Sequence, residues 1–304
     1  MPIFIFLTGT LILNKKFQKD EDVYKFYKHN LLPLIIVNSI WIIIYNVFFW
    51  INNHKDYVTV EFIIKELLLL KQVPLSHMWY LPMIIGLYIG LPFISIMVKA
   101  FSKKTLLLFI AIIFTCSFVL PMINTFIQIL GIKDSYNSLL NISFFGGIYG
   151  IYAIVGYFID DYKKKNHILT ISMAILCYIV TCAIQIFSYI KISKSTTTYY
   201  VWYNFPFLLI CSSCVFKLIL NIDTSKINKK LVNVITFISK TSLGIFFIHI
   251  ITQEILTPYI QNINIIMPFK ILFLFVFNFI LCLIVNLLIC KFKNISKYAI
   301  LVKN

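Results

Sequence analysis

The chain has 304 residues, of which 60% are hydrophobic and only 12% are charged, and its mean hydropathy is +0.90. A soluble domain carries about 25% charged and about 45–50% apolar residues, so a soluble enzyme, a secreted disulfide scaffold and a disordered protein are excluded. The net charge of +16 comes from lysines that stand in short gaps between apolar runs. We therefore expect the charge to orient the chain in a membrane, and we expect no nucleic-acid partner.

The apolar runs predict an all-α, polytopic integral membrane helical bundle. The first run, residues 2–13, is shorter than the roughly 20 residues that a helix needs to cross the bilayer core, and we expect it to be part of a spanning helix. Eight longer runs follow, and each predicts a full span. These runs are residues 31–51, 77–98, 105–130, 141–160, 167–190, 199–220, 231–254 and 269–290. We expect one domain over residues 1–304.

The gaps between the runs alternate between lysine-rich and lysine-poor. Lysines gather in the gap 14–30 and again after residue 290, whereas the gap 255–268 has none. Cytoplasmic loops carry the excess of basic residues, so we expect a cytoplasmic C-terminus and an external residue 1. An external start on a partial helix leads us to expect one more helix upstream, which would make the chain N-terminally truncated.

Two histidines are candidates for chemistry inside or beside the membrane. His77 begins the run 77–98 at its expected outer end, and His249 lies in the outer half of the run 231–254. An ionisable side chain at such depth is a functional hypothesis by default, and a neutral imidazole is a competent general base near pH 7. The alternatives are an interfacial histidine at 77 and a hydrogen-bonded core histidine at 249.

Two lysines are candidates for phosphate binding. Lys25 and Lys28 are three residues apart just before the run 31–51, so they share one face if this stretch is helical. They could hold the phosphates of a nucleotide or coenzyme as point charges. The alternative is an orientation signal that attracts anionic lipid. The five histidines are scattered without carboxylates at ligand spacing, so no metal site is predicted.

Five stretches, in order along the chain, resemble the membrane-bound acyltransferase 3 family of bacterial O-acyltransferases. They are Pro2 to Gly9, Lys25-x-x-Lys28 followed by Pro33, His77-Met78-Trp79-Tyr80-Leu81 through Gly86-Leu87-Tyr88 to Pro92, Gly147 to Asp160, and Ser242-Leu243-Gly244-Ile245-Phe246-Phe247-Ile248-His249. The resemblance covers nearly the whole chain. Lys25 and Lys28 stand where the family has two arginines.

The resemblance implies an enzyme of about ten helices, in a bacterial plasma membrane, that takes an acyl group from acyl-CoA on the cytoplasmic side. It implies a cell-surface glycan or lipid-linked sugar as acceptor, no permanently bound cofactor, and a catalytic histidine on the upstream helix. Within the chain, His77 and His249 are the expected catalytic residues. Trp79 and Tyr80 are expected to bind the acceptor, and Lys25 and Lys28 the donor.

Two other interpretations fit the composition. Kinked apolar helices also suit a transporter or flippase for a glycan or lipid, although few charged groups lie within the runs to mark an ion path. An inactive remnant of the enzyme is the second. The sequence predicts neither the acceptor, nor the acyl group, nor the oligomeric state.

Overall fold

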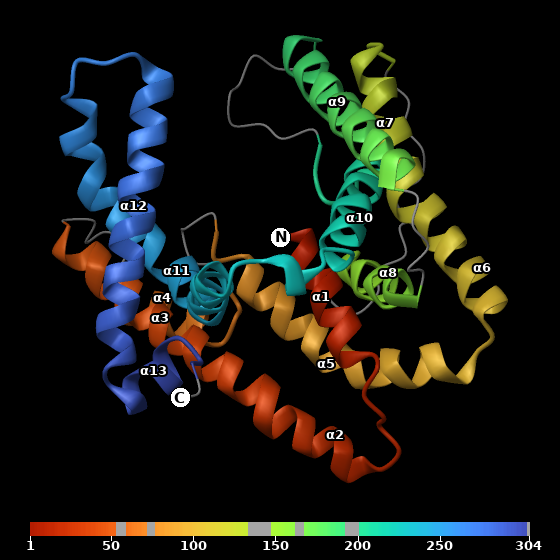
Figure 1. The fold of residues 1–304 in the computed structure, drawn as a ribbon, viewed down its shortest axis with the longest axis horizontal. Helices are drawn as coiled ribbons and strands as arrows, with labels where there is room; N and C mark the ends of the chain where they lie inside the picture. Colours follow the sequence, from red (N-terminus) through yellow and green to blue (C-terminus); the bar gives the residue numbers. More distant parts are fainter. Residues whose placement is uncertain (53–58, 72–76, 133–146, 162–166, 192–200, 303–304) are drawn as a thin grey trace. The chain divides into compact units, whose positions relative to one another are not determined.

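The computed structural model describes residues 1–52, 59–71, 77–132, 147–161, 167–191 and 201–302 (Figure 1). In these ranges the chain is helical between its turns, as the composition predicts. The α-helices are α1 (Pro2–Ile12), α2 (Asp20–Phe26), α3 (Leu32–Ile51), α4 (Val60–Leu67), α5 (Tyr80–Ala100), α6 (Lys103–Phe114), α7 (Leu120–Ile129), α8 (Tyr149–Asp161), α9 (His167–Lys191), α10 (Pro206–Leu220), α11 (Lys229–Gln261), α12 (Met267–Cys290) and α13 (Lys293–Ala299). Shorter helical segments are η1 (Tyr27–Leu31), η3 (Thr115–Val119) and η5 (Thr224–Lys226).

Six helical segments of the described chain are long and apolar enough to cross a membrane. They are Asp20–Ile51, Tyr80–Ala100, Lys103–Ile129, His167–Lys191, Lys229–Gln261 and Met267–Cys290. Six of the eight predicted spans correspond to them. The runs 141–160 and 199–220 correspond to α8 and α10, which have 13 and 15 residues. A total of eight spans therefore stays a prediction, and the first residues of both runs lie outside the described residues.

The late start of α10 follows from its proline. Pro206 is the first residue of the helix, and Phe205 before it is extended, with φ −91° and ψ 126°. A proline ring disfavours the helical conformation in the preceding residue but fits the first helical position. The apolar character of residues 201–205 therefore does not extend the helix.

Two π-helical segments each precede a helix whose second residue is proline. Segment η1 leads into α3 with Pro33, and η3 leads into α7 with Pro121. Proline has no N–H group, and its ring pushes away the carbonyl group four residues earlier, which here lies in the π-helical turn. The wider turn lets the apolar segment continue through the proline.

The described chain divides into two compact units, and each is built from two separate stretches. Unit 1 contains Met1–Tyr27 and Met83–Ile222, and unit 2 contains Lys28–Pro82 and Asp223–Asn304. In unit 1, α1 packs against α8 and α10, and α9 packs against α10. Its core includes Phe6, whose ring lies 5.4 Å from Tyr152 and 5.3 Å from Phe216.

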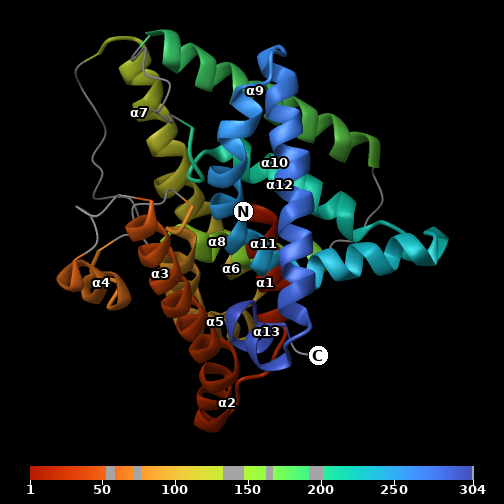
Figure 2. The ribbon, with the colours of Figure 1, turned by 90° about the vertical axis from the view of Figure 1, so that its left-hand side faces the viewer.

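Unit 2 is organised around the antiparallel pair α11 and α12, which Figure 2 shows side by side. Helix α3 packs against α4 and α13. The indole Nε1 of Trp41 on α3 donates to the carbonyl oxygen of Ala299 on α13 at 2.7 Å, and the Trp41 ring stacks on Phe247 of α11 with centroids 4.9 Å apart. These contacts place one face of α3 against α11.

Candidate functional site

The two candidate histidines lie together in unit 2. His77 stands in the turn just before α5, and His249 lies on α11, yet their ring centroids are 4.9 Å apart with the planes at 72°. Phe246 lies beside both rings, with its centroid 5.3 Å from His77 and 6.0 Å from His249. Two imidazoles from distant parts of the sequence therefore share one site.

Tyr45 of α3 completes this cluster, and the sequence analysis did not select it. Its side chain is fully buried, its hydroxyl group donates to the carbonyl oxygen of Phe247, and its oxygen lies 3.2 Å from Nε2 of His77. Because the single phenolic proton is used on the carbonyl oxygen, the tyrosine oxygen can only accept from His77. We therefore assign the proton of His77 to Nε2, which leaves a lone pair on Nδ1.

His249 has the opposite tautomer. Its Nδ1 lies 2.6 Å from the carbonyl oxygen of Phe246 and 3.2 Å from that of Ile245. A carbonyl oxygen can only accept, so Nδ1 carries the proton and Nε2 carries the lone pair. Each ring thus has one nitrogen fixed as a donor and one nitrogen available as a base.

The surroundings of His77 favour its neutral form. Its Nδ1 is buried and has no hydrogen-bond partner among the described residues. Burial, and secondarily the charge on neighbouring His249, lower the pKa of His77 to about 4. The desolvated imidazole is therefore unprotonated at neutral pH, as a general base must be.

Polar side chains of α11 and α12 fix the backbone at His249. Nδ2 of Asn278 donates to the carbonyl oxygen of His249 at 3.0 Å, and Thr252 donates to Oδ1 of Asn278. The hydroxyl group of Thr252 also lies 3.2 Å from the sulfur of Cys282. These bonds tie the turn of α11 that carries His249 to its neighbour α12.

The two predicted acceptor-binding residues lie next to this cluster. The ring of Tyr80 is 5.6 Å from that of Phe246, so it shares a neighbour with both histidines. The ring of Trp79 packs edge-on against Tyr80 at 6.3 Å. The structure therefore brings Tyr80 to the edge of the cluster and Trp79 one ring further out. Their binding roles stay predictions.

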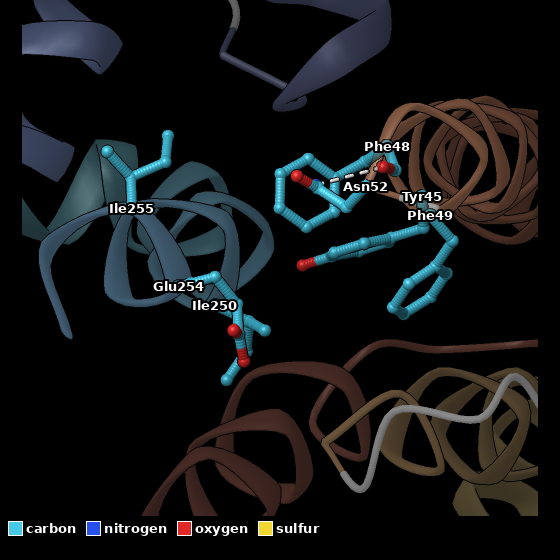
Figure 3. Close-up of a pocket in the computed structure, with 7 residues that line it drawn as sticks. All are labelled: Tyr45, Phe48, Phe49, Asn52, Ile250, Glu254 and Ile255. Atoms are coloured by element: carbon cyan, nitrogen blue, oxygen red, sulfur yellow. Dashed lines mark hydrogen bonds between the residues drawn. The ribbon is translucent and has the colours of Figure 1, made fainter. Parts of the chain in front are cut away.

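A cavity of about 330 Å³ adjoins the cluster between α3 and α11 (Figure 3). Its volume lies at the lower end of the range for small-molecule sites. Tyr45, whose oxygen lies 3.2 Å from Nε2 of His77, forms part of its wall. The full lining is Tyr45, Phe48, Phe49 and Asn52 from α3 and its C-terminal turn, and Ile250, Glu254 and Ile255 from α11.

The two lysines proposed for phosphate binding lie elsewhere. Lys25 is exposed on α2 and Lys28 is exposed on η1, in consecutive helical turns. The boundary between the two units falls between them. Both positions are helical, which is the condition that the sequence analysis set for a shared face, and their role in donor binding stays a prediction.

The sequence holds one signal that points to Tyr45. Asn38, Tyr45 and Asn46 interrupt the apolar run of α3, and all three are buried. A buried polar group needs a partner, and in a membrane helix such groups mark either packing or function. Among the described residues no three His, Cys, Asp or Glu side chains gather as a metal site would require, and the prediction of no metal remains untested.

The chain was compared with known protein families and proteins. A family model of the acyltransferase 3 family, described as an acyltransferase domain, matches residues 1–287. No significant match was found among curated proteins or among solved structures. The match covers most of the chain, includes every candidate residue named above, and implies an acyl-transfer enzyme with multiple membrane-spanning helices. The chain therefore belongs to the acyltransferase 3 family.

Proposed function

We propose that the chain transfers an acetyl or similar acyl group from acyl-CoA to a hydroxyl group of a cell-envelope polysaccharide or lipid-linked glycan. The observation that carries this proposal is the pair formed by His77 and His249, with ring centroids 4.9 Å apart and one free lone pair on each ring. Membership of an acyltransferase family supplies the reaction class, and the lone pairs supply the base that a hydroxyl acceptor needs.

The proposed acyl transfer can be written step by step from the positions of the two histidines. Nδ1 of His77 takes the proton of the acceptor hydroxyl group while the oxygen attacks the thioester carbonyl carbon. The carbon–sulfur bond then breaks, and the coenzyme thiolate leaves and receives the proton. The imidazolium formed in between lies beside His249, whose Nε2 can share the proton, and its charge stabilises the developing oxyanion.

The donor and acceptor are proposed to approach from opposite sides of a bacterial plasma membrane. Lys25 and Lys28 are exposed and cationic, which suits the phosphate groups of coenzyme A. The distribution of lysines in the sequence favours a cytoplasmic position for both residues and for the C-terminus. The histidines are proposed to lie towards the outer side, where an envelope glycan is available.

Acyl transfer in membranes tests this function. Membranes that contain the full chain are supplied with acetyl-CoA labelled in the acetyl group, and base-labile label is measured in the glycan fraction. We expect label in the glycan with the wild type, and a loss of about 10²-fold or more with His77→Gln, because the general base is removed. His167→Gln, at an exposed histidine at the start of α9, is the matched control and should retain activity.

The proposal is overturned if the wild type consumes no acyl-CoA and labels no glycan. It is also overturned if His77→Gln transfers label at the rate of His167→Gln. Movement of an unmodified glycan or lipid across proteoliposomes, without acyl transfer, would favour the transporter interpretation instead.

A further inference from the structure

The cavity beside Tyr45 offers hydrogen-bond acceptors on its described lining. Nδ2 of Asn52 donates to the carbonyl oxygen of Phe48 at 3.0 Å, and Figure 3 shows this bond with the other end of the amide directed towards α11. One N–H of the amide is therefore used within the chain, and the Oδ1 atom is directed away from that bond and can accept from a ligand. Across the cavity Glu254 presents a carboxylate, which can accept hydrogen bonds but cannot donate them.

The remaining walls are apolar and mostly aromatic. Phe48 and Phe49 lie on α3 next to Tyr45, and Ile250 and Ile255 lie on α11. The hydroxyl group of Tyr45 is engaged with Phe247 and His77, so its proton is not available to a ligand. A ligand that fits must bring its own hydrogen-bond donors and present an apolar face to these rings. A sugar ring does both, with hydroxyl groups at its edge and C–H groups on its face.

The charge of the cavity lining narrows the class of ligand further. Glu254 is exposed, and it is the charged residue in the described lining of the cavity. A second anion placed close to a carboxylate is repelled, and the repulsion is stronger at the effective dielectric of a protein surface than in water. An acidic group on the bound sugar would therefore be repelled, whereas hydroxyl or ammonium groups would be accepted.

We propose that this cavity binds the acceptor sugar and that Glu254 makes the enzyme select glycan units without an acidic group. This inference rests on the proposed function and adds the chemical class of the acceptor. It assigns Glu254 as a specificity-determining residue that acts through charge. A uronic acid or a phosphorylated sugar is the class that the site rejects.

Binding to a matched pair of probes tests the inference without requiring turnover. The probes are a neutral gluco-oligosaccharide and its counterpart oxidised to the uronate at C6, and binding to the detergent-solubilised full chain is measured by equilibrium dialysis. We expect the wild type to bind the neutral probe at least about tenfold more tightly than the uronate. In Glu254→Gln, which keeps an acceptor oxygen and removes the charge, we expect the ratio to fall below about threefold.

A charge-shift variant supplies the control. Gln253 lines a different groove, between α11 and α12, so Glu254→Gln combined with Gln253→Glu keeps the net charge and moves the carboxylate off the cavity wall. We expect this double variant to behave like Glu254→Gln. The inference is overturned if the double variant regains the wild-type preference for the neutral probe, or if Glu254→Gln keeps that preference unchanged. It is also overturned if the wild type does not bind the neutral probe.

Acyl transfer is measured separately on the same preparations. Selective binding without any acyl transfer leaves the inference standing and overturns the proposed function. Acyl transfer at equal rates to neutral and acidic acceptors leaves the proposed function standing and overturns the inference.

Discussion

Hydrogen bonds to oxygen atoms decide which nitrogen of each histidine can act as a base. Tyr45 accepts from Nε2 of His77, and the carbonyl oxygen of Phe246 accepts from Nδ1 of His249. The lone pair on His77 therefore depends on its contact with Tyr45 of α3, whereas the lone pair on His249 depends on the backbone of its own helix α11.

The low pKa of His77 predicts the acid limb of the pH–rate profile. The neutral imidazole is the active form, so activity is lost as pH falls through the pKa of His77, which burial and His249 lower to about 4. We expect kcat/KM for acyl transfer to be nearly constant between about pH 5 and pH 7 and to be halved near pH 4. Circular dichroism at pH 4 checks that the loss is not unfolding.

An acid limb near pH 6.5, the value of an unperturbed histidine, would show that the base is not a buried imidazole. The residual acyl transfer of His77→Gln should show no decrease in kcat/KM near pH 4.

The sequence predicts part of this site and misses part for a clear reason. His77, His249 and Tyr80 stand out as polar or amphipathic residues near the ends of apolar runs, and the structure brings all three together. Tyr45 interrupts an apolar run just as Asn38 and Asn46 do, and only its contacts with His77 and Phe247, 32 and 202 positions later, give it a role. Such a contact is set by tertiary packing, which periodicity does not contain.

At the scale of elements, apolar length predicts long helices well and short ones poorly. The run 269–290 becomes α12, Met267–Cys290, almost without change, because no proline or glycine interrupts it. The eight-residue α4 and the seven-residue α13 fall in stretches that the sequence assigns to gaps. Both are amphipathic or polar, and packing against α3 stabilises them, so hydropathy alone does not reveal them.

Helices α1 and α8 approach so closely that glycine is required on both. A Cβ atom at Gly156 would overlap the carbonyl oxygen of Phe6, and one at Gly9 would overlap that of Ala153. Small residues allow this approach in membrane helices. We expect Gly156→Ala to lower stability in detergent by about 1–3 kcal/mol, measured as a drop in the midpoint of thermal unfolding.

Leu11→Ala is the control for this pair, since Leu11 lies on α1 but is largely exposed. It should change the unfolding midpoint little. Equal effects of the two substitutions would mean that α1 and α8 do not depend on backbone contact.

A buried carboxyl group joins α4 to α3. Glu66 is 1% exposed, its Oε2 accepts from Nδ2 of Asn46 at 2.7 Å, and its Oε1 has no partner among the described residues. Burial raises the pKa of Glu66, against the smaller opposing effect of the Asn46 bond. The folded state therefore favours the protonated form. Its contribution to stability is full below the unfolded pKa of about 4.5 and is lost as pH rises through the raised value.

We accordingly expect Glu66→Gln, which imitates the protonated group, to raise stability at pH 7.5 by about 1 kcal/mol. At pH 4.5 it should change stability much less. Thermal unfolding of both proteins at the two pH values gives the comparison. A substitution that lowers stability at pH 7.5 and not at pH 4.5 would show that ionised Glu66 is stabilising and that the burial argument is wrong.

At the scale of the whole molecule, the site depends on two stretches that are far apart in the sequence. Unit 2 combines residues 28–82, which carry Tyr45 and His77, with residues 223–304, which carry His249 and Glu254. The acyltransferase match runs across both stretches and across unit 1 between them. Composition predicts a multi-pass membrane protein from the chain as a whole, but the pairing of the histidines requires these two stretches to pack together.

The central claim is that His77 and His249 form one acyl-transfer site, and a double-mutant cycle on acyl transfer tests it most directly. Labelled acetyl transfer to glycan is measured for His77→Gln, His249→Gln and the double variant in the full chain. Each single substitution should lower the rate by about 10²-fold or more. The double variant should be no more than about threefold slower than the slower single variant, because residues that act as a unit give non-additive losses. Losses that multiply in the double variant, or a single variant that keeps the wild-type rate, would contradict the claim.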